Sequence, residues 1–329
     1  MPVEAQAATK TESTYGTPVT VDKFFEFNEE SIDVEMGRLD ATGMRTGAKG
    51  KRSDRRVVYT KGASGPLKFY VLSKGFGWWL QHLVGGTVTT SGPTDSAYTH
   101  TGTVGVAPRL SGKSFTAQIN RKDNTLTDQV WTFEGGKVTK WGLACDAEGL
   151  LECTVECDFE DFKTNTALAS ASYPTAMEPF SFVGGSVTYN GVTLDILKFG
   201  VDCTDQGLNT DRRLVRANAL KKEPIEEKVP EFKWSAEIEQ GDLTQWGFFA
   251  SATASGSGAQ IVATFAAPTL IGVSAYPTLT VTLPFAGCDE YKVGVKSGLN
   301  HASVGGEVLW DATNPPVTLA YKTLDATPL

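Results

Sequence analysis

Cysteine is scarce in this chain, which has five among 329 residues. An odd number at this low density does not suit a disulfide framework and indicates a reducing compartment. Long hydrophobic runs are also missing. The longest apolar cluster, residues 76–84, is far too short to span a membrane, and residues 1–19 hold no apolar run of the kind a secretory signal needs. We therefore expect a protein made in the cytoplasm, without membrane insertion.

Residues that could hold a metal or perform catalysis are few. The Cys153 and Cys157 thiols need two further ligands to bind zinc, and the sequence offers no second pair or nearby histidine, so core packing is favoured. Residues 112–114 (GKS) end like a phosphate-binding loop, but Ala107 stands where that loop requires glycine, and a strand-like run follows. No motif surrounds the three histidines. The sequence therefore predicts no catalytic, cofactor-binding or metal-binding residue.

Positive charge is in deficit, since 30 Lys and Arg stand against 38 Asp and Glu, for a net charge of -8. Phosphate contacts need positive charge, so this balance argues against a general nucleic-acid binder. Glycine, in contrast, is abundant at 34 residues, and threonine, valine and serine are frequent. That mixture is typical of many short strands joined by turns, and it predicts a mainly β protein.

Hydrophobic patterning places the elements. A short helix with an aromatic face is expected over residues 75–84 (GFGWWLQHLV), followed by a Gly/Ser/Thr-rich connection over 85–112. Strands are expected over residues 24–35, 67–73, 114–120, 129–134, 137–145 and 150–160.

The clearest strand, residues 150–160, alternates between two kinds of side chain. Apolar residues at 151, 153, 155, 157 and 159 take one face of the sheet, because side chains repeat every second residue along a strand. The other face carries Glu152, Thr154, Glu156, Asp158 and Glu160. We expect one face to be core and the other an acidic wall.

Residues 40–62 have no apolar periodicity and contain several glycines, so they predict a long exposed loop. The loop is basic, and its positive charge is offset by Asp54. Its cationic residues are Arg45, Lys49, Lys51, Arg52, Arg55, Arg56 and Lys61.

Four segments are expected along the chain. They are a flexible arm over residues 1–20, a first β module over 21–163, a linker over 164–180 and a second β module over 181–329. Residues 53–58 (SDRRVV) are echoed by 210–215 (TDRRLV), the aromatic helix by 242–250 (DLTQWGFFA), and the acidic strand, in position only, by 317–323. These echoes favour an internal duplication; the alternative is chance likeness between two β-rich halves.

Several short segments, taken in order, carry a family resemblance. They are residues 15–20 (YGTPVT), 25–31 (FEFNEES), 52–56 (RSDRR), 74–80 (KGFGWWL), 98–101 (YTHT), 112–116 (GKSFT), 133–138 (FEGGKV) and 169–174 (ASASYP). In this order they resemble the tail tube proteins of siphophages that infect Gram-positive and related bacteria. The resemblance covers residues 15–240 and is looser beyond.

The resemblance implies tail-tube-type β-sandwich or half-barrel modules and no enzymatic activity. Sheets of neighbouring subunits would join into a closed barrel around a lumen, and a long loop and terminal arms would bind the next ring. It implies a virion protein of the phage tail, assembled in the host cytoplasm, with itself, the tape measure protein and the tail terminator and tip proteins as partners. Double-stranded DNA would pass through without sequence-specific binding.

Elementary physics favours the same assembly. Open sheet edges must be paired or covered, and a ring of edge-paired subunits removes them. Rings that stack through unlike surfaces form an open filament. Two modules in each chain favour a trimer with pseudo-sixfold symmetry; if the second half is a decoration instead, six chains are needed.

Two surfaces are candidate functional sites. The acidic face from Glu152 to Glu160 is interpreted as lumen lining, because carboxylates repel DNA phosphates, with an ordinary solvated outer face as the alternative. Nothing near these carboxylates supplies a nucleophile, which argues against acid/base catalysis. The basic stretch from Arg45 to Lys61 is interpreted as a contact to an acidic surface of the adjacent ring, with nucleic acid or plain solvent as alternatives.

Two other functions stay open. A carbohydrate-binding or adhesin-like β module needs exposed aromatic platforms and a stable monomer. A β-sheet hydrolase needs a catalytic constellation that the sequence does not reveal.

Overall fold

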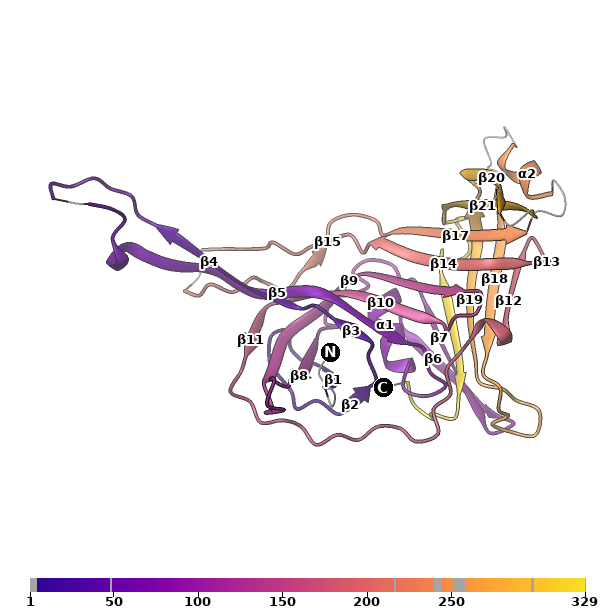
Figure 1. Ribbon diagram of the computed structural model, residues 1–329, viewed down its shortest axis with the longest axis horizontal. Helices are drawn as coiled ribbons and strands as arrows, with labels where there is room; N and C mark the ends of the chain where they lie inside the picture. The colour runs from indigo at the N-terminus through magenta and orange to yellow at the C-terminus, as the bar shows by residue number, and fades with distance from the viewer. Residues whose placement is uncertain are drawn as a thin grey trace.

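The computed structural model describes residues 5–47, 49–215, 217–239, 244–250, 258–296 and 299–328, and it confirms a mainly β protein with short helices (Figure 1). The first half contributes β1 (Gln6–Thr11), β2 (Lys23–Phe25), β3 (Glu29–Glu30), β4 (Asp33–Asp40), β5 (Arg56–Tyr70), β6 (Val88–Thr94), β7 (Ala97–Thr103), β8 (Phe115–Asn120), β9 (Val130–Asp146), β10 (Glu152–Phe159) and β11 (Asp161–Lys163). The second half contributes β12 (Gly185–Tyr189), β13 (Val192–Leu194), β14 (Ile196–Asp205), β15 (Leu208–Asn209), β16 (Ile225–Glu226), β17 (Glu231–Glu239), β18 (Gly258–Ala266), β19 (Thr278–Gly287), β20 (Glu290–Lys296), β21 (Leu299–Glu307) and β22 (Thr318–Thr323). The helices are α1 (Gly77–Val84) and α2 (Thr244–Phe249), with 3-10 turns η1 (Ser53–Arg55) and η2 (Phe182–Gly184).

The largest sheet has thirteen strands. Its long row runs β4-β5-β10-β9-β14-β17-β21-β20, and every neighbouring pair in it is antiparallel. A branch leaves the row at β9, whose first part pairs with β8 and β11 and leads on to β1 and β2. The glycine pair at 135–136, with Gly135 at φ +66°, lies where β9 passes from the branch to the row. The structure therefore replaces the two strands expected over 129–145 with one.

The long row is one four-strand pattern used twice. In the first pattern, β4 and β5 form a hairpin and α1 follows it in the chain. Two later strands, β9 and β10, complete the pattern: β10 pairs with β5, and β9 pairs with the other edge of β10. The order β14-β17-β21-β20 repeats this arrangement with α2, β21 and β20. The two patterns meet where β9 pairs with β14. Of the matching residues, 53–55 lie in the turn between β4 and β5 and 56–58 begin β5, whereas 210–215 lie wholly in the connection between β14 and β17.

One of the sequence echoes does not hold. The echo at residues 317–323 corresponds to β22, which lies in the other sheet between β19 and β7, whereas β10 lies in the long row. By strand pairing, the counterpart of β10 is β21, which chain position alone could not indicate.

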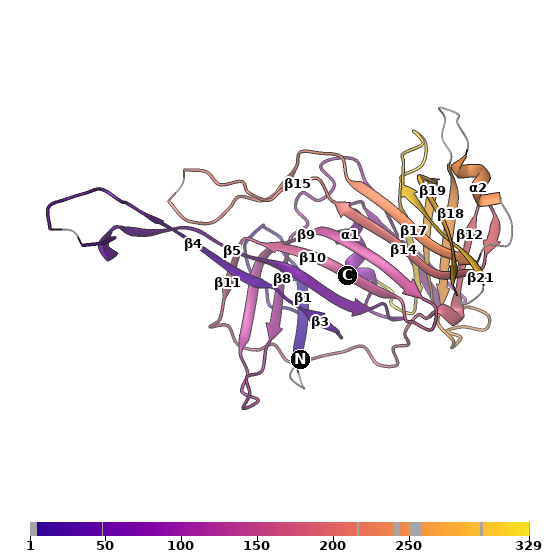
Figure 2. The ribbon, with the colours of Figure 1, turned by 45° about the horizontal axis from the view of Figure 1, so that its top comes forward.

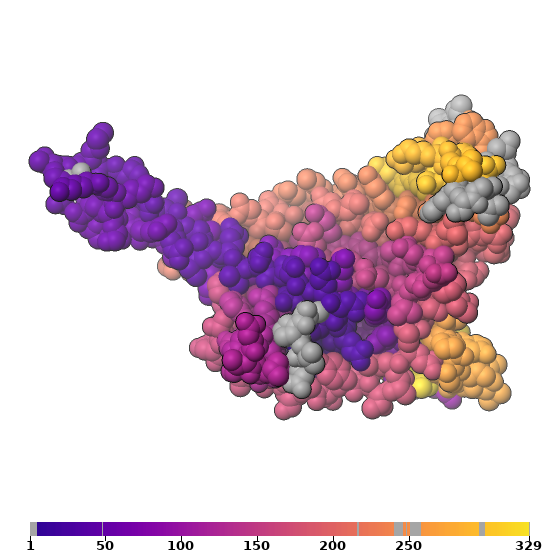
Figure 3. All heavy atoms as spheres, in the orientation of Figure 1, coloured from indigo at the N-terminus to yellow at the C-terminus, as the bar shows by residue number. Residues whose placement is uncertain are grey.

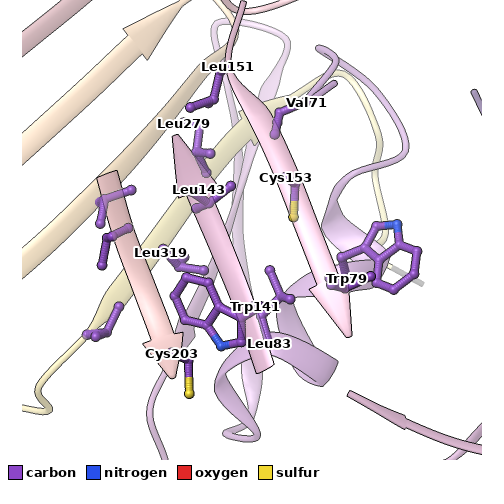
Figure 4. Packing of buried hydrophobic residues seen from close by; sticks show 14 of the residues in the cluster. Val71, Trp79, Leu83, Trp141, Leu143, Leu151, Cys153, Cys203, Leu279 and Leu319 are labelled. Carbon is purple, nitrogen blue, oxygen red and sulfur yellow. The ribbon is translucent and has the colours of Figure 1, made fainter. Parts of the chain in front are cut away.

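The second sheet has seven strands in the order β13-β12-β18-β19-β22-β7-β6, so it mixes strands from both halves of the chain. Its inner face packs on the inner face of the long row: Phe199 of β14 lies 6.5 Å from Phe265 of β18, and Tyr189 of β12 lies 5.6 Å from Trp234 of β17, between ring centroids. Figure 4 shows Leu279 and Leu319 from this sheet beside Leu143 and Trp141 of β9. The two halves thus share one core.

Helix α1 lies where the sequence predicts a short helix, and it fills the core beneath the first half of the row. Trp78, Trp79, Leu80 and Leu83 are all buried, and the partly exposed Gln81 donates to Thr11 Oγ1. The helix ends at Gly85, which adopts the left-handed conformation favoured at this position. The ammonium group of Lys113, in the rejected phosphate-loop motif, donates to the backbone carbonyls of Gly85 and Gly86 and so caps the helix. The predicted second helix, 242–250, matches α2 from 244; residues 242–243 lie outside the described part.

Three expectations are corrected. Residues 40–62 are not one loop, because β5 begins at Arg56 and pairs with β4 in a long hairpin; the loop is residues 41–55. Neither β4 nor residues 56–59 of β5 have a buried face, so this part of the hairpin lacks the period-two signal. The connection over 85–112 contains β6 and β7, where β6 is mostly exposed and polar. The N-terminal segment over residues 1–20, expected to be flexible, contains β1, which pairs with both β2 and β8, and Ala7 and Ala8 are buried there.

The position of β22 between the halves generates a stability prediction. Leu319 of β22 is fully buried, so Leu319→Ala leaves a cavity and should lower the free energy of unfolding by about 2–5 kcal/mol. Leu309→Ala, at a residue 45% exposed, should change it by about 0.5 kcal/mol or less. Urea unfolding followed by tryptophan fluorescence measures both. Equal midpoints for the two variants would contradict the central placement of β22.

Candidate assembly surfaces

The side of the long row that faces away from the core is here called the charged face; it consists of the outward side chains of β5, β10, β9, β14, β17 and β21. Figure 2 shows β5, β10, β9, β14 and β17 side by side. On β10 the predicted alternation holds for most of the strand: Cys153 and Val155 are fully buried, and Glu152, Thr154 and Glu156 are partly exposed on the opposite side. The sequence therefore identified the core and outward faces of this strand.

Two of the predicted wall residues do not reach the charged face. Asp158 is buried and forms an ion pair with Lys221, a residue from the loop that connects β14 to β17. Burial raises the pKa of Asp158, and the nearby Lys221 ammonium opposes that shift. Glu160 lies beyond the end of β10, is also buried, and packs against the backbone of Gly16. Chain segments distant in sequence cover both carboxylates, which strand periodicity cannot reveal.

The charged face is not uniformly acidic, because lysines on it stand beside carboxylates of neighbouring strands. Lys140 Nζ lies 3.3 Å from Glu156 Oε2, and Lys198 Nζ lies 3.1 Å from Asp146 Oδ1. Lys233 is opposite Asp202 on one side and Glu307 on the other. Between the charges on β9, β14, β17 and β21 many outward positions are small: Gly142, Ala144, Gly200, Ser235, Ser303 and Gly305. On β5 the outward Tyr70 is larger and 40% exposed. The result is a low-relief surface with locally matched charge.

The two ends of the long row are open edges in the described residues. There, β4 pairs only with β5, and β20 pairs only with β21. Each edge leaves a line of backbone N–H and C=O groups free to pair with another strand. Val34 and Met36 on β4, and Val293 and Val295 on β20, are exposed apolar residues at these edges. Sequence patterning could not mark them, since an edge is defined by which strands pair.

The β4–β5 hairpin, here called the arm, projects from the body as a narrow extension (Figures 1 and 3). Its tip, residues 41–55, carries most of the predicted basic stretch. Part of this charge is matched locally: Arg52 Nε donates to Asp54 Oδ1 at 2.8 Å, and Lys51 Nζ lies 3.2 Å from Asp40. Arg45 and Lys49 are exposed at the tip.

Two residues of the basic set lie on β5 itself. Arg56 begins the strand, and its Nε lies 3.2 Å from Asp40 Oδ1. Lys61 lies at the base of the arm, forms an ion pair with Asp161, and stands 4.8 Å from the Phe162 ring centroid. Lys61 therefore helps to anchor the arm.

The arm is also apolar, which the sequence analysis missed. Leu39 is 56% exposed and Val57 60%, and Val58 and Tyr59 are nearly half exposed. A projecting surface of this kind marks an interaction site more often than a solvated loop. The two consecutive valines, Val57 and Val58, were the only hint of this strand in the sequence. Because neither face of the strand is buried there, they fit neither the helical nor the strand periodicity.

The loop between β14 and β17, residues 206–230, leaves the sheet at the same end of the strands as the arm and runs beside it (Figures 1 and 2), and the part of the loop that returns to β17 is held to the body. Lys137 of β9, fully buried, lies 2.7 Å from Glu223 Oε1, and Arg109 Nε lies 3.8 Å from Glu226 Oε1. Burial lowers the pKa of Lys137, and the Glu223 carboxylate opposes that shift. These contacts fix the corner of the body beside the arm.

The described residues offer little for metal chemistry. All five cysteines are free and buried, and burial raises the pKa of Cys153 and Cys157, so both thiols are held neutral in the core. Within the described ranges, no three His, Cys, Asp or Glu side chains gather as a metal site would require. No helix in the described part of the chain is long and apolar enough to cross a membrane.

Comparison with known proteins gives one match over most of the chain. No curated protein matched the sequence significantly. The family model described as "Phage tail tube protein" matches residues 3–296, which include the arm, β20 and all of the charged face except β21. The chain therefore belongs to the phage tail tube protein family.

Proposed function

We propose that this chain is a non-catalytic virion protein that polymerises into stacked rings and forms the hollow tail tube of a siphophage. The observation that carries the proposal is the twice-used four-strand pattern, which ends in open edges and presents one continuous charged face, in a member of the tail tube family. The strand row can continue from one copy of the chain to the next through backbone hydrogen bonds between their open edge strands.

The repeated pattern supports rings of three chains. Each chain carries the four-strand unit twice, so three chains supply six units, and the ring has pseudo-sixfold symmetry. Such a ring contains about 24 strands, more than the 16–18 that already leave an aqueous channel in porins. Six chains would double this number.

The charged face is the proposed lumen lining, with Glu152, Thr154 and Glu156 on it. Each lysine named on that face stands beside a carboxylate, so a passing phosphate meets no unmatched cation. The small side chains between the charges offer few projecting groups that could bind or obstruct a molecule moving along the lumen. This chemistry suits DNA and the tape measure protein as mobile contents.

The arm is the proposed contact to the adjacent ring. Its apolar strands supply buried area, and its basic tip supplies complementarity to a carboxylate-rich surface of another copy. Tail terminator and tip proteins would contact the last rings of the stack. Assembly in the host cytoplasm agrees with five unpaired thiols.

The lumen assignment predicts a difference in thiol labelling. Concentrated protein should form hollow fibres in negative-stain micrographs. In these fibres Thr154→Cys should resist a polymer-linked maleimide too large to enter the lumen, and it should react in the unassembled chain. Val183→Cys, at a residue 80% exposed and away from the charged face, is the control and should react in the unassembled chain.

Two results would contradict this assignment. Equal labelling of Thr154→Cys before and after fibres form would place the charged face outside the tube. A chain that stays monomeric at every concentration would contradict the proposal that it forms a tube.

The arm assignment predicts a charge-dependent assembly defect. Arg45→Glu combined with Lys49→Glu reverses the exposed tip charge, so rings should stack poorly and the concentration needed for fibres should rise about tenfold or more. Added salt should weaken assembly of the unmodified chain and affect the reversed variant less, because salt screens exposed charges.

The charge-conserving pair Arg45→Lys and Lys49→Arg is the matched control and should assemble normally. Sedimentation of fibres across a concentration series measures all three proteins. Normal assembly of the charge-reversed variant would show that the tip makes no contact between rings.

A further inference from the structure

A cavity of about 300 Å³ opens beside α1, and no strand of the charged face lines it. Segments distant in the chain meet there: β1 and β2, α1 with the preceding Gly75, the stretch at residues 172–174, and the C-terminal residues 325–328. Figure 1 shows the C-terminus close to β2. The volume is at the lower limit for ligand pockets, so the cavity suits a small molecule.

Aromatic side chains form the floor of the cavity. Trp78 and Trp79 of α1 line it together with Phe24 and Phe25 of β2. The Trp79 ring is nearly perpendicular to the rings of Trp78 and Phe25, at 85° and 84°, with centroids 4.8 and 5.4 Å apart. The two indoles are at most 3% exposed, so packing holds this floor rigidly. Rings turned in different directions around a small space attract cations, because each ring face is electron-rich.

Carboxylates stand at the rim of the cavity. Asp22 and Asp325 both line it, against one lining cation, Lys23. Gly75 N donates to Asp325 Oδ2 at 2.8 Å, and His100 Nε2 lies 2.8 Å from the Asp325 backbone oxygen, so this aspartate is fixed in place. A carboxylate has about four acceptor sites and can therefore serve a further positive group. The rim is net negative above an aromatic floor.

We propose that this cavity binds a small trimethylammonium compound, with its methyl groups on the aromatic floor and its positive charge facing Asp325. A quaternary ammonium has no N–H group that would need a hydrogen-bond partner among aromatic rings. An anion would be repelled by Asp22 and Asp325. The inference is independent of the proposed tube, because the charged face, the arm and the strands β4 and β20 do not line the cavity.

Choline chloride is the probe, titrated calorimetrically into the unassembled full chain at constant ionic strength. It should bind at one site and shift the indole N–H resonance of Trp79. The uncharged isostere 3,3-dimethylbutan-1-ol has the same shape and should bind about tenfold more weakly, because it lacks the attraction of a cation to the rings and carboxylates. Phosphocholine should also bind more weakly than choline, since the rim repels its phosphate; tighter binding would keep the trimethylammonium site and identify the phosphate ester as the source of the group.

Variants locate the site. Ser172→Arg places a guanidinium at the rim, where it should compete for the cavity and weaken choline binding about tenfold or more. Ser170→Arg, on the same segment but outside the lining, is the matched control. Both serines are exposed, so both chains should fold.

Asp325→Asn keeps an acceptor for Gly75 N but removes the charge, and it should weaken choline binding about fivefold. Asp311→Asn, at an exposed residue outside the cavity, should leave binding unchanged. Circular dichroism checks the fold of all four variants.

The outcomes decide the inference without reference to the tube. Choline binding that Ser172→Arg and Asp325→Asn weaken, and that both controls retain, supports the site. Equal binding of choline and its uncharged isostere would show a merely apolar hollow and overturn the assignment. The inference is also overturned if choline gives no binding up to about 50 mM, or if Ser172→Arg binds choline like the unmodified chain.

Discussion

Backbone hydrogen bonding at the ends of the long strand row is the constraint on which this account depends. An antiparallel sheet that ends in water leaves a line of unpaired N–H and C=O groups, and natural proteins cover such edges or use them. In the described residues β4 and β20 are left open, while the equivalent strands β14 and β9 are paired within the chain. The chain therefore contains one completed join, between β9 and β14, and two open edges that the proposed assembly would bring together.

The roles proposed for the charged face and the arm follow from the pairing of these edges. If the row continues from copy to copy, the charged face becomes one side of a closed wall, and its matched lysines and carboxylates make a surface with few unpaired charges. The arm then extends from the end of that wall, where it can reach a neighbouring ring, while the returning part of the 206–230 loop is held to the body through Glu223 and Glu226. Together these features describe a subunit that is folded alone but has unpaired edges.

Sequence reasoning succeeded where one face of an element is buried. The alternation from Leu151 to Phe159 identified β10 and its outward side, and the aromatic run at 76–84 identified α1. It failed where neither face is buried, as in the arm, where Val57 and Val58 follow no period, and in the mostly exposed β6. The burial of Asp158 and the edge position of Val293 are set by contacts between segments that are distant in the chain. A single sequence does not reveal which distant segments meet.

The most direct measurement of the central claim is a cryo-electron microscopy reconstruction of the assembled fibre at a resolution that traces strands. The account predicts an unbroken antiparallel wall around a lumen, with the row of each chain continuing from β20 into β4 of the next. It predicts three chains in each ring, with the outward side of β10 facing inward. A reconstruction in which β4 and β20 face solvent, or in which copies meet without strand pairing, would contradict it.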